Sequence, residues 1–304
     1  MSETFTIASD ELTVRIAALG AELLSIADAS GAEWITDGDP AFWSGHAPIL
    51  FPIVGELAGG VMRLDGREYP LPRHGFARRR EFDTVEHGEG NLVLRLSDDE
   101  ATRQVYPFAF DLELHYAIEG ATLSVAAIIR NTGDEPMPFC IGFHPGFVWP
   151  LPGGGAKLKH RIVFDKREPG PIRRLDADGL LRAYEDTNVG PDGVLDLRPI
   201  LFENDAMIWD QPASRALTYE GETTEGIRAA AIAIAYPDCP MLGIWQKPGA
   251  DFICLEPWAG IADPAGFDGD FRTKPGVMEL APGEDRSFAV AITIRPAAPL
   301  TEGD

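Results

Sequence analysis

The stretch Phe110-Asp-Leu-Glu-Leu-His-Tyr-Ala-Ile118 decides the fold class, because apolar residues occupy every second position along it. Successive side chains of a β-strand point to opposite faces, so a period of two predicts a half-buried strand. The same alternation occurs at Leu12–Ile16, at Leu92–Leu96 and at Phe288–Ile294. Strand patterning therefore extends from one end of the chain to the other.

Turn sequences separate these runs, at Asp65-Gly66, Glu119-Gly120, Asn131–Asp134 and Pro282-Gly283. Many short strands divided by such turns are typical of sandwiches and barrels. The best helix signal is the capping pattern Ser97-Asp-Asp-Glu100, which opens a segment that must end before Pro107. No long amphipathic helices alternate with strands, which argues against a parallel α/β sheet. We expect an all-β chain: one large antiparallel β-sandwich with few short helices, forming a single domain over residues 1–304.

Composition narrows the classes of function. The chain has a formal net charge of −22 at pH 7, which disfavours nucleic acid and anionic lipid as partners. The amino terminus lacks a basic region followed by an apolar core, and no apolar run approaches the roughly 20 residues of a membrane helix. We therefore expect a cytoplasmic protein without a membrane span. Cys140, Cys239 and Cys254 lie in apolar runs without metal-type spacing and are expected to be buried free thiols.

One long segment is rich in turns. It begins at Leu151–Gly155 and continues through charged residues to about Arg182. Long loops in compact domains often line binding sites, so we expect this segment to be an excursion that forms a wall of the site.

Four short segments place polar residues in apolar surroundings, and they are His74–Arg78, Gly142–Phe147, Asn204–Ile208 and Cys254–Trp258. Glu256 follows an apolar run and precedes Pro257, which keeps the residue before it out of the helical region. We expect its carboxylate at a strand end, partly desolvated between Leu255 and Trp258. Desolvation raises the pKa of a carboxyl toward the range of a general base. The plainer alternative is an edge glutamate that reaches solvent.

The two candidate histidines also have plainer interpretations. His144 lies between two glycines and two phenylalanines, which would allow close backbone approach and give apolar walls for a sugar; a core histidine bonded to backbone is the alternative. His74 begins a loop that carries Arg78 four residues later, and a surface loop is its alternative.

Other chemistries have less support. Two histidines and a carboxylate could form a metal triad, but no His-x-His or His-x-x-x-His pair supports one, and we expect no metal. A serine hydrolase lacks its Gly-x-Ser-x-Gly elbow. A glycosidase, which uses a pair of carboxylates, stays open as an interpretation, with Asp205 and Glu256 as the pair.

In this order, the polar segments resemble the aldose 1-epimerase (galactose mutarotase-like) superfamily, and its short bacterial branch most of all. The matching text is Ala47-Pro-Ile-Leu-Phe-Pro-Ile-Val-Gly55, His74-Gly-Phe-Ala-Arg78, Gly142-Phe-His144-Pro, Phe202-Glu-Asn-Asp205-Ala, Gly243-Ile-Trp245 and Cys254-Leu-Glu256-Pro-Trp258. Each segment alone is weakly specific, whereas the ordered set spans most of the chain and is strong.

The resemblance implies a β-sandwich with a sugar bound in a cleft across one sheet, and a mutarotase that interconverts the anomers of an aldose. By this likeness Glu256 is the catalytic base, His144 the catalytic acid and His74 a second histidine near the reacting end. Asp205 matches an aspartate that holds sugar hydroxyls. Aromatic packing against the sugar is expected from Trp245, Trp258 and Phe143. Proton transfer alone suffices for ring opening, so no cofactor is expected.

The sequence departs from the family at Ser44-Gly-His46-Ala-Pro48, where relatives often carry an arginine. His46 would replace it only in part. Arg78 fits one phosphate-binding position of the hexose-6-phosphate branch and the other is missing, which, with the acidic net charge, favours a neutral aldose. A hexose-6-phosphate 1-epimerase and a non-catalytic sugar-binding or sensing protein are the alternatives. The expected partner is a small sugar, and the expected state a monomer or homodimer.

Overall fold

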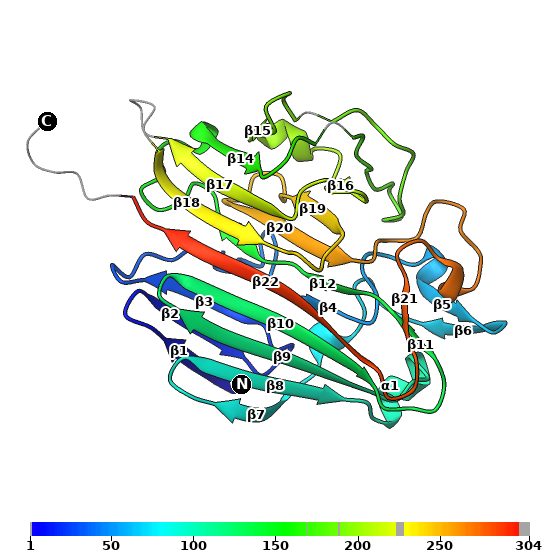
Figure 1. Cartoon of the computed structure of the whole chain (residues 1–304). Coiled ribbons are helices and arrows are strands. Elements are labelled where there is room, and N and C mark those ends of the chain that lie inside the picture. Colours follow the sequence, from blue (N-terminus) through cyan, green and yellow to red (C-terminus); the bar gives the residue numbers. More distant parts are fainter. Residues whose placement is uncertain (1, 169, 188, 223–227, 298–304) are drawn as a thin grey trace, which may run out of the picture.

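The computed structural model describes residues 2–168, 170–187, 189–222 and 228–297 (Figure 1). Antiparallel strands dominate them, as the period of two predicts. The largest sheet has nine strands in the order β15-β14-β17-β18-β22-β10-β9-β8-β7. Their bounds are β7 Asp83–His87, β8 Asn91–Ser97, β9 Phe110–Glu119, β10 Thr122–Asn131, β14 His160–Phe164, β15 Val194–Asp196, β17 Ala216–Glu222, β18 Arg228–Ala235 and β22 Asp285–Arg295. The four runs of alternating residues correspond to β8, β9 and β22 of this sheet and to β2 (Leu12–Ala17).

A second sheet of six strands carries the polar segments. Its order is β16-β19-β20-β12-β4, with β13 also paired to β20. The bounds are β4 Ile49–Leu50, β12 Ile141–Phe143, β13 Gly146–Val148, β16 Met207–Trp209, β19 Met241–Trp245 and β20 Phe252–Ala259. Smaller sheets pair β1 (Thr4–Ala8) and β3 (Leu23–Asp28) with β2, β5 (Val61–Leu64) with β6 (Arg67–Pro70), and β11 (Met137–Phe139) with β21 (Met278–Leu280).

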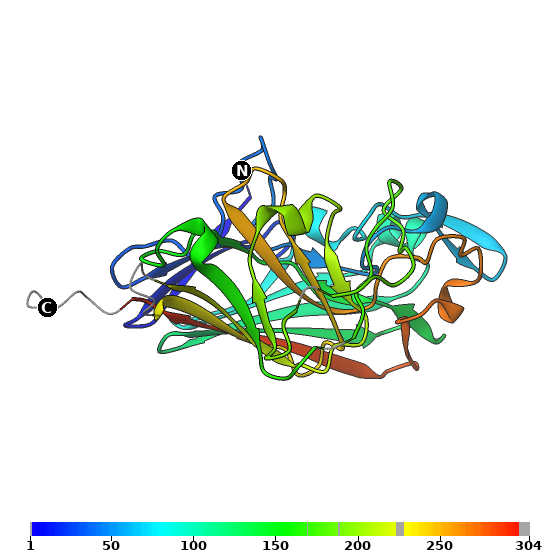
Figure 2. The same cartoon turned by 90° about the horizontal axis from the view of Figure 1, so that it is seen from above.

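The main core lies between the two larger sheets. Viewed from above, the nine-stranded sheet forms one curved layer, and β20 and the amino-terminal strands lie on the other side of the interior (Figure 2). On β9, the alternate residues Phe110, Leu112, Leu114 and Tyr116 are buried. Tyr116 and Phe143 of β12 line the same small interior space, so β12 turns one face toward the large sheet. The opposite face of the six-stranded sheet, which points away from this core, carries a cleft.

The predicted helix is present, but its cap differs from the prediction. Helix α1 spans Glu100–Val105 and is capped by Asp99, not by Ser97. The Asp99 carboxylate accepts a hydrogen bond from the Thr102 backbone N–H, and the Thr102 hydroxyl accepts one from the Asp99 N–H. Short 3₁₀ turns occur at η1 Ala58–Gly60, η2 Ala77–Arg79, η3 Lys157–Lys159, η4 Pro199–Phe202 and η5 Phe271–Thr273.

The segment from Leu151 to Arg182 is only in part the expected loop. Its residues His160–Phe164 form strand β14, which pairs with β17 in the large sheet. Alternate residues of β14 are buried, a pattern that the neighbouring charges obscure in the sequence. Leu175 from the remainder does reach the cleft. All three cysteines are buried free thiols, as predicted. In the described part of the chain, no helix is long and apolar enough to span a bilayer.

Candidate active site

An interruption in strand pairing creates the site. On one side, β20 pairs first with β12, where Gly142 lies opposite Trp258, and then with β13, where Gly146 lies opposite Cys254. Between these two short strands the chain passes through His144 and Pro145, which face residues 255–257 of β20. The structure thus corrects one expectation: Glu256 lies in the middle of β20, not at a strand end. Pro257 is tolerated there because the ladder on this side is already broken, so its missing N–H leaves no partner unpaired.

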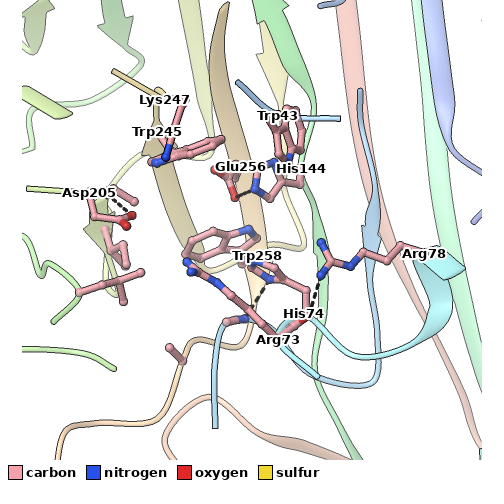
Figure 3. Close-up of a pocket in the computed structure, with 15 residues that line it drawn as sticks. Trp43, Arg73, His74, Arg78, His144, Asp205, Trp245, Lys247, Glu256 and Trp258 are labelled. Atoms are coloured by element: carbon pink, nitrogen blue, oxygen red, sulfur yellow. Dashed lines mark hydrogen bonds and ion pairs between the residues drawn. The ribbon is translucent and has the colours of Figure 1, made fainter. Parts of the chain in front are cut away.

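The interruption brings His144 into direct contact with Glu256 on the floor of the cleft (Figure 3). His144 Nε2 lies 3.1 Å from Glu256 Oε2, and the side chains are 9% and 2% exposed. Among the described residues, Glu256 Oε2 has no partner with hydrogen-bond geometry, and neither has His144 Nδ1. The two groups are close enough to share a proton and retain unused hydrogen-bonding capacity for a ligand.

Three aromatic side chains hold the His144 ring in place. The Trp43 ring stacks on it at 4.9 Å between centroids and an interplanar angle of 29°. The rings of Trp245 and His74 approach edge-on, at 6.0 Å and 5.7 Å. A ring packed on several sides keeps one orientation, which a proton-transfer group requires.

Burial sets the protonation of the pair. It lowers the pKa of His144 to about 3, and the positive charges of Arg78 and Arg73 act in the same direction. Burial also raises the pKa of Glu256 well above its usual value, against the opposing effects of Arg73 and of the Trp258 side chain. Both shifts disfavour the charged forms, so the two groups titrate as a coupled pair.

The Trp258 indole lies flat across the neighbouring strands. A Cβ atom added to Gly243 of β19 would lie 2.4 Å from Trp258 Cη2, and one added to Gly142 of β12 would lie 2.7 Å from Cδ1. Glycine is therefore required at both positions, because any side chain would lift the ring from the sheet. The indole forms an apolar floor beside Glu256, of the kind that packs against sugar C–H groups.

Asp205 faces His144 and Glu256 from the other side of the pocket (Figure 3). Its backbone has a positive φ of 66°, and its Oδ1 accepts a hydrogen bond from the Ala206 N–H. Buried Arg174 donates from Nη1 to the Asp205 carbonyl oxygen at 2.7 Å. Arg174 thus holds the strained loop that presents the carboxylate.

Cations surround the pocket. Arg73, Arg78 and Lys247 all contribute to its lining. Arg78 Nη2 donates to the Arg73 carbonyl oxygen at 2.9 Å, and burial lowers the pKa of the Arg78 guanidinium. Within the described ranges, none of these three cations forms an ion pair with a carboxylate.

The cleft has a volume of about 290 Å³, at the lower end of the range for small-molecule sites. This size favours one monosaccharide over a longer chain. The lining brings together seven residues named from the sequence: His74, Arg78, His144, Asp205, Trp245, Glu256 and Trp258.

Two of the predicted residues lie elsewhere. Phe143 is 4% exposed and points from β12 into the core between the sheets, because its neighbours Gly142 and His144 take the other face. His46 is not part of the pocket lining among the described residues. Its backbone N–H donates to Glu22 Oε1 at 2.6 Å and its carbonyl accepts from Gly146, so it fixes a loop beside the site.

Among the aromatic and charged residues of the lining, sequence reasoning missed Trp43, Arg73 and Lys247. Arg73 directly precedes His74, and Lys247 lies two positions after Trp245, just past the end of β19. Those two could have been found from their neighbours. Trp43 lies in a loop without periodicity, and nothing in the sequence distinguishes it from a core tryptophan.

One group in the described part of the chain has the composition of a metal site. The ligand atoms of His144, Cys254 and Glu256 lie within 4.8 Å of one another, and all three side chains are buried. Imidazole, thiolate and carboxylate together suit zinc. Cys254 and Glu256 share one face of β20, which is why the thiol adjoins Glu256 and His144.

Comparisons with known proteins show the family of the chain. A family model described as aldose 1-epimerase matches residues 3–263. Protein LacX of Lactococcus lactis subsp. lactis is 30% identical over 301 residues, which cover 96% of this chain and 99% of LacX.

Solved structures show the same fold. A galactose mutarotase related enzyme from Lactobacillus acidophilus superposes with a TM-score of 0.87 at 30% identity, covering 97% of this chain and 98% of that one. A galactose mutarotase-like protein from Lactobacillus casei gives 0.88 at 28% identity, covering 96% and 100%. The fold is therefore galactose mutarotase-like, and the chain belongs to the aldose 1-epimerase family.

Proposed function

We propose that the protein is a mutarotase, which interconverts the α and β anomers of a monosaccharide through ring opening. The contact between His144 Nε2 and Glu256 Oε2 at the floor of a sugar-sized cleft carries the proposal. The proposed base, Glu256, and the proposed acid, His144, lie beside one another. This arrangement suits the reaction, because the anomeric hydroxyl and the ring oxygen are both bonded to C1.

The reaction needs two proton transfers. The reaction proceeds from the ionised form of the pair, a Glu256 carboxylate beside a His144 imidazolium. The carboxylate accepts the proton of the anomeric hydroxyl as the hydroxyl oxygen becomes the aldehyde oxygen. The C1–O5 bond breaks, its electron pair passes to O5, and His144 donates a proton to O5. Rotation about C1–C2 and the reverse transfers close the ring on the other face. A positioned acid or base contributes about 10²–10⁴-fold per transfer.

The other lining residues have supporting roles in this proposal. His74 donates a hydrogen bond to oxygen that gains negative charge. Trp245 and Trp258 pack against the C–H face of the sugar, and Asp205 accepts hydrogen bonds from hydroxyls at the end away from C1.

Polarimetry of freshly dissolved α-glucose or α-galactose tests the proposal. The native protein should accelerate the decay of rotation, and Glu256→Gln and His144→Asn should each remove most of the acceleration while the circular dichroism spectrum stays native. A protein that binds sugar, yet leaves the decay rate unchanged at saturating concentration, would instead be a sensor of the same fold.

A phosphorylated aldose is the second candidate substrate. The observation that favours it is the set of three cations, Arg73, Arg78 and Lys247, that line the cleft without an acidic partner in the described residues. A neutral sugar leaves those charges uncompensated, whereas a phosphate would accept charge-assisted hydrogen bonds from them.

Matched substrates separate the two candidates. If the substrate is a hexose 6-phosphate, kcat/KM should be higher for glucose 6-phosphate than for glucose, and Arg73→Ala and Arg78→Ala should lower the first value far more than the second. Equal losses for both sugars would assign the arginines to the neutral substrate.

A further inference from the structure

A buried ion pair lies behind the cleft, outside the residues that line it. Lys274 Nζ lies 3.2 Å from Asp263 Oδ1, and the two side chains are 0% and 3% exposed. Burying two charges is costly unless the pair positions something that the fold needs. Lys274 follows η5 and Asp263 follows β20, so the pair connects the end of the catalytic strand to the next loop.

Asp263 is bound on both sides to the segment that begins at Gly55. Its Oδ2 accepts a hydrogen bond from the Ala58 N–H at 2.8 Å, and its own N–H donates to the Glu56 carbonyl oxygen at 2.9 Å. Gly55 itself packs closely on the preceding residue: an added Cβ would lie 2.5 Å from the Ala262 Cβ. The ion pair therefore fixes the position of the Gly55 peptide.

Gly55 in turn fixes His74. The His74 N–H donates to the Gly55 carbonyl oxygen at 2.9 Å, and the Gly55 N–H donates to His74 Nδ1 at 3.1 Å. A nitrogen that accepts a hydrogen bond carries no proton, so the proton of the neutral imidazole must reside on Nε2. His74 is kept in this loop by a positive φ of 66°, which only the surrounding contacts make tolerable for a histidine.

We propose that the buried Asp263–Lys274 pair is a positioning device that, through the Gly55 peptide, locks His74 as a neutral Nε2–H donor directed at the reacting oxygens. The two histidines then have different roles. His74 can donate a hydrogen bond but cannot accept a proton at Nδ1, so proton transfer is left to His144. The catalytic consequence rests on the proposed mutarotase function, whereas the tautomer does not.

The tautomer can be measured directly. In ¹⁵N-labelled protein, the imidazole signals of His74, assigned by their loss in His74→Gln, should show Nδ1 unprotonated and Nε2 protonated at neutral pH. A protonated Nδ1, or a mixture of tautomers, in the native protein would overturn the proposal whether or not the protein is a mutarotase.

Replacing the Asp263–Lys274 pair by uncharged residues tests whether the pair controls the tautomer of His74. Asp263→Asn combined with Lys274→Met removes both charges without leaving one unpaired, and Glu168→Gln is the control. Glu168 is also buried and binds backbone N–H groups, of Ala213 and Ser214, away from the cleft.

The double variant should show a mixture of His74 tautomers, and a kcat about tenfold lower with little change in KM, at temperatures where it is folded. Glu168→Gln should lose stability only. If the double variant has a lower melting temperature but keeps the native His74 tautomer and the native kcat, the pair has only a structural role and the proposal is wrong. If the double variant does not fold, Lys274→Met alone is measured in the same way.

Discussion

The substitution Gly243→Ala should distort the active site without touching any charged group. The new Cβ would lie 2.4 Å from Trp258 Cη2 and 2.6 Å from Cζ2, which is 1.0 Å and 0.8 Å closer than the 3.4 Å at which ordinary contact begins. Gly243 lies opposite Glu256 in the paired strands β19 and β20, so the backbone has little freedom to retreat. The indole must therefore rise into the cleft by about 1 Å.

The size of the effect follows from that displacement. A misplacement of about 1 Å in an active site can cost about 10²-fold in rate, or about 2.7 kcal/mol of transition-state stabilisation. Overpacking should also lower the free energy of unfolding by about 1–3 kcal/mol. Polarimetry gives kcat/KM, and urea unfolding followed by tryptophan fluorescence gives the stability. Gly170→Ala is the control, because nothing lies within 4 Å of an added Cβ there.

A double-mutant cycle makes the reasoning refutable. In a Trp258→Phe background the smaller ring leaves room for the methyl group, so the cost of Gly243→Ala should shrink markedly. If Gly243→Ala costs the same in both backgrounds, or costs nothing in the native one, the indole does not rest on this glycine and the description of the cleft floor is wrong.

Three further results are expected. Burial raises the pKa of Glu256 in the folded protein, so native stability falls as the pH rises above about 4.5, the usual value for this carboxyl. Glu256→Gln should therefore gain melting temperature over the native protein progressively as the pH is raised from that value; a constant difference would contradict this. Arg174→Met frees the loop that Arg174 holds through the Asp205 carbonyl, so KM should rise about fivefold with kcat nearly unchanged. The ligand atoms of Cys254, His144 and Glu256 lie within 4.8 Å of one another, so Zn²⁺ should bind there and inhibit the enzyme in competition with sugar. Cys254→Ala should raise the inhibition constant for Zn²⁺ by about tenfold. Equal inhibition of both proteins would show that the thiol is not a zinc ligand.

The fold could be predicted because the alternation of apolar and polar residues depends on each strand by itself, through the one face that the strand buries. Phe110, Leu112 and Leu114 show the period of two, and the burial of each is decided mainly by the strand itself. The position of Glu256 could not be obtained in the same way. Pro257 was interpreted as the end of a strand, whereas β20 continues through it. That continuation depends on the gap between β12 and β13, which is a property of the partner strands.

The two residues proposed as catalytic could be found from the sequence for a different reason. Glu256 and His144 are polar residues in apolar surroundings, and such residues are costly to bury without a use. Trp43 carries no such signal, because a tryptophan in the core and a tryptophan stacked on a catalytic ring look alike in a sequence. Trp43 stacks on His144 only because the fold brings together two segments that are about a hundred residues apart in the chain.

The net charge was the least useful guide to the substrate. An overall charge of −22 favoured a neutral sugar, yet the cleft is lined by Arg73, Arg78 and Lys247. Exposed charges farther than a Debye length of about 8 Å are largely screened at physiological salt, so the acidic surface contributes little at a buried site. Cations within the cleft act over shorter distances and through a lower dielectric. The field that a ligand meets beside Glu256 is therefore set by these few side chains, and the substrate charge must be argued from them.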